Sequence, residues 1–317
     1  MKGYSIGKRR GLHCCANEAG IFTILALDHG DSLLKTIRPD APNTVSFTEA
    51  VSIKATVLQT LASEASAVLL DPVYGLAPAI LHGVLPGDTG LLLAVEDGDY
   101  ATPQRPARLF ESWHVEKIKR TGANAVKCFF YYHPNDHDLA QAQEAFVADL
   151  VDECRQQDLP LFAEPLSYNT PPADRPRVVV ETARKISALG VDVLKVEFPV
   201  DIHHQPDEAV WLSACQALTD ACQGIPWVLL SAGVDFEAFA KQVQIACQAG
   251  ASGYLAGRAI WKEAVQLSGA AQQAFLEETA RLRLQTLAQI ATESATPWTA
   301  YYPYQTDVPP REWYQTY

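Results

Sequence analysis

Eight short apolar segments recur along the chain, and each is followed by a polar or glycine residue and then by a helical pattern. From the second segment onward, their starts lie 23, 35, 35, 33, 33 and 27 residues apart, the length of one strand and one helix. The segments are continuously apolar, which is typical of a parallel sheet covered on both faces. They comprise residues 22–27, 67–70, 90–95, 125–130, 160–163, 193–198, 226–230 and 253–256.

The segments between these runs carry the end signals of helices. Residues 183–189 end at Gly190 and residues 236–249 end at Gly250, where the C-cap of a helix belongs. Asp235 is placed as the N-cap of the second of these helices. Eight strands that alternate with helices over roughly 250 residues predict an α/β fold of the (β/α)₈ TIM barrel class.

A doubly wound parallel sheet is the alternative fold. It needs about six strands and usually a glycine-rich fingerprint after the first strand. Here the first predicted strand ends in Leu27-Asp28-His29-Gly30, which lacks that fingerprint. The barrel is therefore the favoured prediction.

The barrel is expected to occupy residues 21–265, after an N-terminal lead of residues 1–20 and before a C-terminal extension of residues 266–317. The extension opens as a helix with one apolar face, formed by Leu276, Ala280, Leu284, Leu287 and Ala291. Its end is rich in aromatic residues: Trp298, Tyr301, Tyr302, Tyr304, Trp313, Tyr314 and Tyr317. We expect this tail to pack on the barrel or on a neighbouring subunit, with stacking on a ligand as the alternative.

The charge balance disfavours nucleic acid and anionic membranes as partners. Lys and Arg total 25 against 37 Asp and Glu, a formal net charge of −12. No stretch approaches the ~20 apolar residues of a membrane span, and the first residues do not resemble a signal peptide. The seven cysteines are odd in number and form no C-x-x-C motif. Free thiols and a cytoplasmic location are expected.

The active sites of such barrels are built at the C-terminal ends of the strands. Two lysines there are unusual, because Lys127 and Lys195 lie within apolar runs. A buried ammonium group costs several kcal/mol unless it is paired. The ionisable residues at these strand ends are Asp28, Asp71, Glu96, Asp97, Lys127, Glu164, Lys195, Glu197 and Arg258.

Two interpretations of the lysines are open. Either lysine can form a structural ion pair, with Glu164 or Glu197 as its partner. The other interpretation is a Schiff-base enzyme, because alternate strands share one layer of the barrel interior and so bring the two amines close together. An amine that lies near another cation and away from water has a lowered pKa and can attack a carbonyl. The residues favour this second interpretation, but they do not show whether Lys127 or Lys195 is the nucleophile.

A phosphate site is predicted after strands 7 and 8. Ser231 and Gly233 follow one strand, and Gly257 and Arg258 follow the other. Small residues there expose backbone N–H groups at helix N-termini, and an arginine suits a phosphate or a sulfonate. Tight turns with a surface arginine are the alternative. A phosphorylated carbonyl compound is the expected substrate.

No metal and no cofactor are expected. The histidines of the sequence HPNDH are four residues apart, but Pro134 disfavours a regular helix there. Neither a zinc-binding H-E-x-x-H motif nor a G-x-S-x-G esterase motif occurs.

Six segments together resemble a known family: LALDHGDSL, KCFFYYHPND, FAEPLSY, VLKVEFPVD, VLLSAGVDFEAF and GASGYLAGRAIW. They are similar to class I (Schiff-base) aldolases of the tagatose-1,6-bisphosphate aldolase type, with sulfofructose-phosphate aldolase as a close relative. The archaeal-type fructose-bisphosphate aldolases and deoxyribose-phosphate aldolase are more distant. The similarity covers roughly residues 20 to 265. It implies a (β/α)₈ barrel and metal-free retro-aldol cleavage of a ketose 1-phosphate or 1,6-bisphosphate.

The resemblance also implies roles for individual residues. Lys195 matches the Schiff-base lysine, Lys127 the second lysine of the site, and Glu164 the acid/base glutamate. Asp28 matches the aspartate near the reacting carbons. The groups around a substrate phosphate match Ser231, Gly233, Gly257 and Arg258.

One position departs from the tagatose type. That type has Gln-Arg after the strand 1 aspartate, whereas this chain has His29-Gly30. The Asp-His-Gly form resembles the archaeal-type branch, and His29 is counted among the expected substrate-binding residues. The identity of the substrate therefore stays open.

Two other functional classes remain as alternatives. One is a different enzyme on a phosphosugar-binding barrel, such as an isomerase, an epimerase or a transaldolase. The other is a non-catalytic sensor of a sugar phosphate. Symmetric assemblies are common among soluble enzymes, and the aromatic tail offers a contact for a homo-oligomer.

Overall fold

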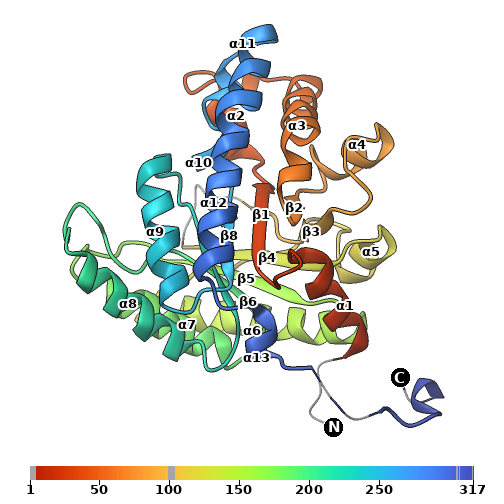
Figure 1. Ribbon diagram of the computed structural model, residues 1–317, viewed down its shortest axis with the longest axis vertical. Coiled ribbons are helices and arrows are strands. Elements are labelled where there is room, and N and C mark those ends of the chain that lie inside the picture. Colours follow the sequence, from red (N-terminus) through yellow and green to blue (C-terminus); the bar gives the residue numbers. More distant parts are fainter. Residues whose placement is uncertain (1–4, 99–103, 305, 307, 316) are drawn as a thin grey trace.

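The computed structural model describes residues 5–98, 104–304, 306, 308–315 and 317. Its eight parallel strands pair in chain order, and the eighth pairs with the first to close a barrel, which confirms the predicted fold (Figure 1). The strands are β1 (Phe22–Leu27), β2 (Ala67–Leu70), β3 (Gly90–Ala94), β4 (Ala125–Tyr131), β5 (Leu161–Leu166), β6 (Val193–Val196), β7 (Trp227–Leu230) and β8 (Gly253–Ala256).

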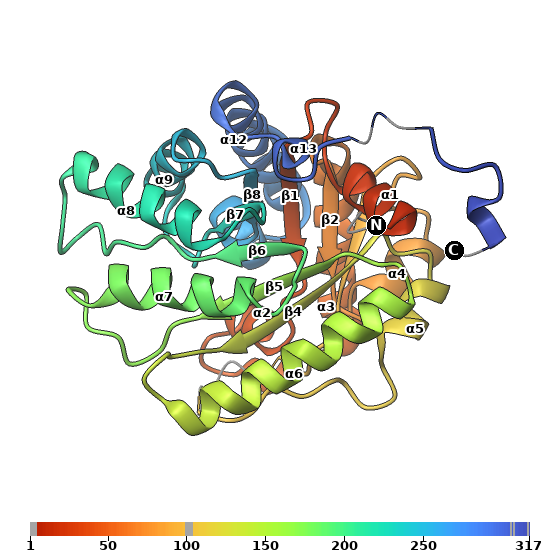
Figure 2. The same ribbon diagram turned by 90° about the horizontal axis from the view of Figure 1, so that it is seen from below.

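Helices surround the barrel, as Figure 2 shows. Asp235 caps one of them as predicted, because its carboxylate accepts a hydrogen bond from the Ala238 N–H at 2.9 Å. Gly190 and Gly250 follow two helices with φ of +89° and +113°, a region that favours glycine. The helices are α1 (Ile6–Cys15), α2 (Asp31–Ile37), α3 (Phe47–Leu61), α4 (Leu76–Leu81), α5 (Val115–Arg120), α6 (His137–Gln156), α7 (Arg175–Ser187), α8 (Glu208–Ala221), α9 (Phe236–Gln248), α10 (Arg258–Trp261), α11 (Gly269–Ala274), α12 (Arg281–Ser294) and α13 (Trp298–Tyr301).

The strands are mainly apolar because they separate two apolar layers. Alternate side chains point into the barrel, where Ile24, Leu69, Leu92, Phe162 and Val228 pack together. The side chains between them point outward and pack against the helices. Neither face of a strand meets water, so neither face carries the polar residues of an exposed sheet.

The helix α1 closes the N-terminal end of the barrel. Its Leu12 and Cys15 pack with the barrel interior and are fully buried. The contact is close: a Cβ added at Gly11 would lie 2.3 Å from the Asn124 carbonyl oxygen. The opposite end, where the strands finish, is the end at which a cavity opens.

The C-terminal extension packs on the same barrel. Its predicted apolar face is fully buried, and it consists of Leu276, Ala280, Leu284, Leu287 and Ala291. Further along, Trp298 is also fully buried. Tyr302 donates a hydrogen bond to the Asp192 carbonyl oxygen at 2.8 Å, and the Gly7 N–H donates one to the Tyr317 hydroxyl at 2.7 Å.

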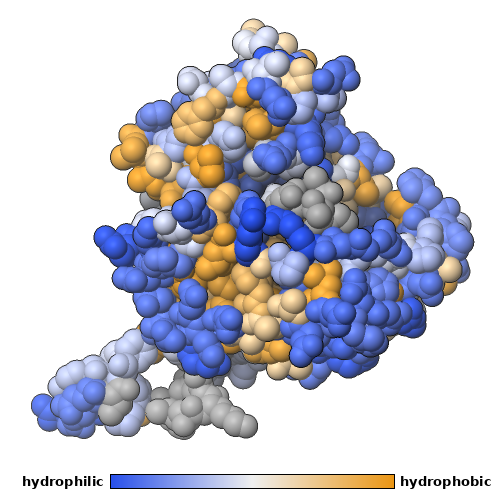
Figure 3. Space-filling model, turned by 180° about the vertical axis from the view of Figure 1, so that it is seen from behind, coloured by the Kyte–Doolittle hydropathy of each residue, from blue (hydrophilic) through white to orange (hydrophobic). Residues whose placement is uncertain are grey.

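All seven cysteines are free, as predicted, and six of them are buried. None of the helices described is both long enough and apolar enough to cross a membrane. Exposed apolar side chains lie on α4, where Ile80 is 49% and Leu81 81% exposed. Figure 3 shows hydrophobic residues at the surface of the face opposite to that of Figure 1. Apolar surface of this kind is typical of contacts between chains, and the homo-oligomer stays a prediction.

Candidate active site

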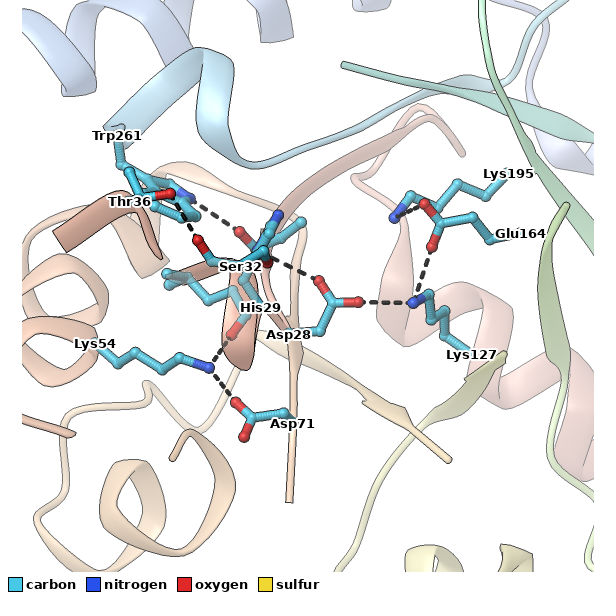
Figure 4. A network of polar contacts seen from close by, with 12 residues as sticks. Asp28, His29, Ser32, Thr36, Lys54, Asp71, Lys127, Glu164, Lys195 and Trp261 are labelled. Atoms are coloured by element: carbon cyan, nitrogen blue, oxygen red, sulfur yellow. Dashed lines mark hydrogen bonds and ion pairs between the residues drawn. The ribbon is translucent and has the colours of Figure 1, made fainter. Parts of the chain in front are cut away.

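A buried layer of charged side chains lies above the apolar interior of the barrel. It follows from the strand period of two, because the residue two positions after an inward apolar residue also points inward. Two positions after Ala26 comes Asp28, two after Phe162 comes Glu164, and two after Val193 comes Lys195. Figure 4 shows one continuous line of contacts from Lys195 through Glu164 and Lys127 to Asp28.

Lys127 is enclosed by three carboxylates. Its Nζ atom lies 2.8 Å from Asp28 Oδ2, 2.7 Å from Glu96 Oε1 and 2.9 Å from Glu164 Oε2. The Lys127 side chain has no exposed surface. This amine therefore acts as the positive centre of an otherwise acidic cluster.

Lys195 has a different environment. Its Nζ atom lies 2.9 Å from Glu164 Oε1, and its side chain lines a cavity of about 230 Å³ at the mouth of the barrel. Lys127 does not line this cavity. Glu164 thus bridges the two lysines, one through each carboxylate oxygen.

Glu197 pairs with an arginine instead of a lysine. Its carboxylate accepts hydrogen bonds from Arg175 Nη2 at 2.7 Å and from the Ser167 N–H at 2.9 Å. Of the two partners considered for a structural ion pair, Glu164 is therefore the one that contacts the lysines.

The buried carboxylates have opposite pKa shifts. Burial by itself raises the pKa of Asp28, but the charges of Lys127 and Lys195 outweigh it and hold that pKa well below its usual value. Burial also raises the pKa of Glu96, and there the nearby Lys127 does not cancel the effect. Asp28 is therefore an anion at neutral pH, and Glu96 accepts a proton more readily than an exposed glutamate.

His29 is a neutral imidazole in this site. Burial lowers its pKa to about 3, and the positive charges of Arg258 and other groups oppose the raising effect of Asp28. Its ring lies edge-on to Trp261 with 5.1 Å between ring centroids. Gly257 makes room for it, since a Cβ there would lie 2.8 Å from His29 Cε1.

The predicted phosphate residues lie together after β7 and β8, the two strands that follow the one carrying Lys195. Ser231, Gly257 and Arg258 line it. The Arg258 guanidinium lies over Gly233, where an added Cβ would be 3.4 Å from Cζ. Gly233 has a φ of +79°, so this turn requires a residue that tolerates the left-handed region. Within the part of the chain that the structure describes, the guanidinium group of Arg258 forms no hydrogen bond or ion pair, and it is free to bind an anion.

The structure therefore brings the predicted residues into one site. Seven of them line the cavity: Asp28, His29, Glu164, Lys195, Ser231, Gly257 and Arg258. Lys127 and Gly233 contact members of this set from behind.

Lys54 is a residue of the site that the sequence reasoning missed. It lies on α3, and its fully buried Nζ donates a hydrogen bond to the Leu27 carbonyl oxygen at 2.7 Å and pairs with Asp71. It thereby holds the end of β1, which carries Asp28. A signal was available, because Lys54 falls on the apolar face of its helix among Ala50, Val57, Leu58 and Leu61.

The described residues offer no side-chain cluster suited to binding a metal ion. No group of three or more His, Cys, Asp or Glu side chains among them is arranged to hold an ion. The many carboxylates of the site contact lysines.

Residues 22–263, which span the whole barrel, match the family described as DeoC/LacD family aldolase. The chain belongs to this family, and it is therefore an aldolase, a member of the lyases.

Two curated relatives have informative names. The chain is 32% identical to Tagatose 1,6-diphosphate aldolase 1 of Enterococcus faecalis, over 93% of this chain and 98% of that protein. It is also 32% identical to Tagatose 1,6-diphosphate aldolase of Listeria monocytogenes serotype 4a, over 92% of this chain and 94% of that protein. The resemblance found in the six sequence segments is thus confirmed.

Solved structures share the fold. An archaeal fructose 1,6-bisphosphate aldolase superposes with a TM-score of 0.62 at 18% identity, over 89% of this chain and 98% of that one. A second structure, of a Schiff-base-forming fructose-1,6-bisphosphate aldolase, gives a TM-score of 0.61 at 19% identity over the same shares. At this identity the likeness establishes the barrel.

Proposed function

We propose that the protein is a class I aldolase that forms a Schiff base through Lys195 and cleaves a ketose 1-phosphate or 1,6-bisphosphate. The products are dihydroxyacetone phosphate and an aldehyde. One observation carries this proposal: the Lys195 amine lines the cavity beside a carboxylate, and the side chain of Arg258, which forms no ion pair with a described residue, lines the same cavity. The names of the curated relatives support the same class of substrate.

The surroundings of the two lysines support Lys195 as the nucleophile. A nucleophile must touch both its substrate and a base. Lys195 lines the cavity and, among the residues that the structure describes, forms an ion pair with Glu164 alone. Lys127 has three carboxylate partners and does not line the cavity. Its role in the proposal is to hold the three carboxylates in place.

Glu164 accepts and donates the protons in the formation of the Schiff base. Its Oε1 atom takes a proton from the Lys195 ammonium group, and the neutral amine adds to C2 of the ketose. Glu164 then gives this proton to the C2 oxygen, which becomes a hydroxyl. Glu164 next takes a second proton from the nitrogen of the adduct and passes it to that hydroxyl, so that water leaves and an iminium forms. The proposal needs no external base for these steps, because the two groups are 2.9 Å apart.

The same carboxylate serves in the cleavage. Glu164 takes the proton of the C4 hydroxyl, the C3–C4 bond breaks, and its electrons enter the iminium to give an enamine. Asp28, held as an anion, accepts hydrogen bonds from substrate hydroxyls and orients them. Glu164 then protonates C3 of the enamine, and water releases dihydroxyacetone phosphate from Lys195.

The phosphate at C1 is assigned to the turns that follow β7 and β8. Arg258 supplies the charge, and Ser231 and the backbone of the two glycine turns supply neutral donors. His29 is neutral, so it offers the substrate a hydrogen-bonding group without charge.

A trapping experiment separates this function from the alternatives. Sodium borohydride should inactivate the enzyme when a ketose 1-phosphate is present and spare it when the sugar is omitted. Dihydroxyacetone phosphate should accumulate without an added acceptor, which a transaldolase would need. Inactivation by borohydride that does not depend on the sugar, or isomerised sugar as the product, would contradict the proposal.

A further inference from the structure

Ser32 lines the catalytic cavity, although no step of the proposed reaction uses it. It lies near the start of α2, the helix that follows β1. Its hydroxyl oxygen is buried and forms no hydrogen bond within the part of the chain that the structure describes. A buried hydroxyl without a partner costs free energy in the folded protein. A ligand in the cavity would supply the missing partner.

His29 carries a second polar atom of this kind in the same cavity. Its Nδ1 atom is buried and, among the described residues, has no hydrogen-bond partner. The Oδ1 atom of Asp28 lies 3.7 Å from it, which is too far for a hydrogen bond. His29 and Ser32, which we call the β1 wall, therefore present two polar atoms to the cavity that the fold leaves without partners.

Neighbouring contacts hold the β1 wall in place, as Figure 4 shows. The indole N–H of Trp261 donates a hydrogen bond to the Ala26 carbonyl oxygen at 2.9 Å, and its ring packs edge-on against His29. The Ser32 carbonyl oxygen accepts a hydrogen bond from the Thr36 hydroxyl at 2.7 Å. The wall is thus built before a ligand binds.

The turn after β8 brings a cation to this wall. Burial is the main reason why the pKa of His29 is low, and the nearby charge of Arg258 contributes to it. A Cβ added at Gly257 would lie 2.8 Å from His29 Cε1, so the turn and the wall are in contact. A phosphate has more acceptor oxygens than one guanidinium group fills, and hydroxyl and imidazole N–H groups are suitable further donors.

A neighbouring opening also contains an arginine, but that arginine is already paired. The opening, of about 200 Å³, shares Leu230 and Ala232 with the catalytic cavity and is lined by Arg175. The Arg175 Nη2 atom donates a hydrogen bond to Glu197 at 2.7 Å. Among the described residues, the guanidinium group of Arg258 has no such partner. An incoming phosphate therefore gains more from Arg258 than from Arg175.

We propose that Ser32 is a substrate-binding residue, whose hydroxyl donates a hydrogen bond to the phosphate that Arg258 holds, with His29 as the second neutral group beside it. This inference deepens the function proposed above and rests on it. Because the Ser32 hydroxyl has no partner in the ligand-free fold, its removal should weaken binding without weakening the fold.

Inorganic phosphate is the first probe, since its binding requires no aldol chemistry. In Ser32→Ala the dissociation constant for phosphate, measured by calorimetry, should rise roughly 2- to 10-fold, the effect of one neutral hydrogen bond. The free energy of unfolding without phosphate should be no lower than that of the wild type. An unchanged phosphate affinity in Ser32→Ala, or no phosphate binding to the wild type, would overturn the inference.

Two further variants separate the hydroxyl from the packing around it. Ser252→Ala is the matched control, because Ser252 also has a buried hydroxyl without a described partner but precedes β8, at the opposite end of the barrel. It should leave the phosphate affinity unchanged. Ser32→Thr keeps the hydroxyl and should retain most of the affinity. A loss in Ser252→Ala as large as that in Ser32→Ala would contradict a direct contact.

The proposed product shows which part of the substrate Ser32 binds. Dihydroxyacetone phosphate should react with Lys195, so the concentration that gives half-maximal inactivation by borohydride measures its binding. Ser32→Ala should raise that concentration roughly 2- to 10-fold for dihydroxyacetone phosphate and leave it unchanged for dihydroxyacetone. Equal rises for both compounds would assign Ser32 to a sugar oxygen and overturn the phosphate contact. If borohydride traps neither compound on the wild type, the proposed function fails, and the phosphate titration still decides the role of Ser32.

Discussion

Glu164 and Lys195 form an ion pair inside the mouth of the barrel, with 2.9 Å between Oε1 and Nζ. Both side chains are nearly buried, at 7% and 6% exposure, yet both line the cavity. The two atoms are in direct hydrogen-bonding contact, so a proton can pass between them without an intervening water. The proposed chemistry depends on this pair more than on any other contact.

Glu164→Gln should keep the size of the side chain and remove the base. We expect turnover to fall by roughly 10²–10⁴, while the affinity for the ketose phosphate is largely retained. Steady-state kinetics together with a binding titration measure the two effects separately. A variant that unfolds, or that loses affinity at normal turnover, would show that Glu164 is only a structural partner of the lysines.

Arg258→Ala should weaken binding of the phosphorylated substrate. A charge-assisted contact contributes about 1.5–3 kcal/mol, so KM should rise by roughly 10- to 150-fold. The unphosphorylated ketose serves as the control, because it lacks the group that Arg258 is proposed to bind. Equal KM changes for the two sugars would remove Arg258 from the anion site.

Lys54→Met should lower the free energy of unfolding by about 3–5 kcal/mol, because it leaves the buried Asp71 carboxylate without its cation. Denaturant titration measures the loss. The double variant Lys54→Met with Asp71→Asn should recover part of it. Lys185→Met, at a half-exposed lysine, is the control and should change stability little. A full loss in the double variant would argue against the ion pair as the cause.

His29 should make the protein less stable in acid. Its pKa is about 3 in the folded state, and an unfolded histidine has a pKa near ~6.5. Between these values the unfolded chain binds a proton that the folded one does not, so stability falls as the pH falls. From pH 7 to pH 5 the wild type should lose about 2 kcal/mol more than His29→Asn. Equal losses in denaturant titrations would show that His29 is protonated in the fold.

The barrel was predictable because its strands are apolar on both faces. Strand β5 shows where this signal stops: the prediction ended at residue 163, whereas the strand continues to Leu166. Glu164 and Pro165 look like the end of a strand in the sequence. The Glu164 carboxylate is tolerated inside because two lysines meet it there. The sheet register pairs Pro165 with Phe130.

The site was predictable where its residues lie at strand ends, and less so elsewhere. The strand period places Asp28, Glu164 and Lys195 on the inner face, so their meeting follows from the fold. Lys54 reaches the site from a surrounding helix, and its sequence pattern shows only that it lies on an apolar face. Lys195 lines the cavity and Lys127 does not, because the two amines lie at different depths in the barrel. The spacing of residues in the sequence does not reveal this depth.

The most direct test of the account is to locate the borohydride label. Treatment with a ketose 1-phosphate and borohydride should attach the reduced three-carbon phosphate to the peptide that contains Lys195, as mass spectrometry of the digest would show. Lys195→Ala should abolish labelling and cleavage, and Lys127→Ala should slow turnover but keep the label on Lys195. Label on the Lys127 peptide, or cleavage that requires a divalent metal and leaves no label, would contradict the assignment.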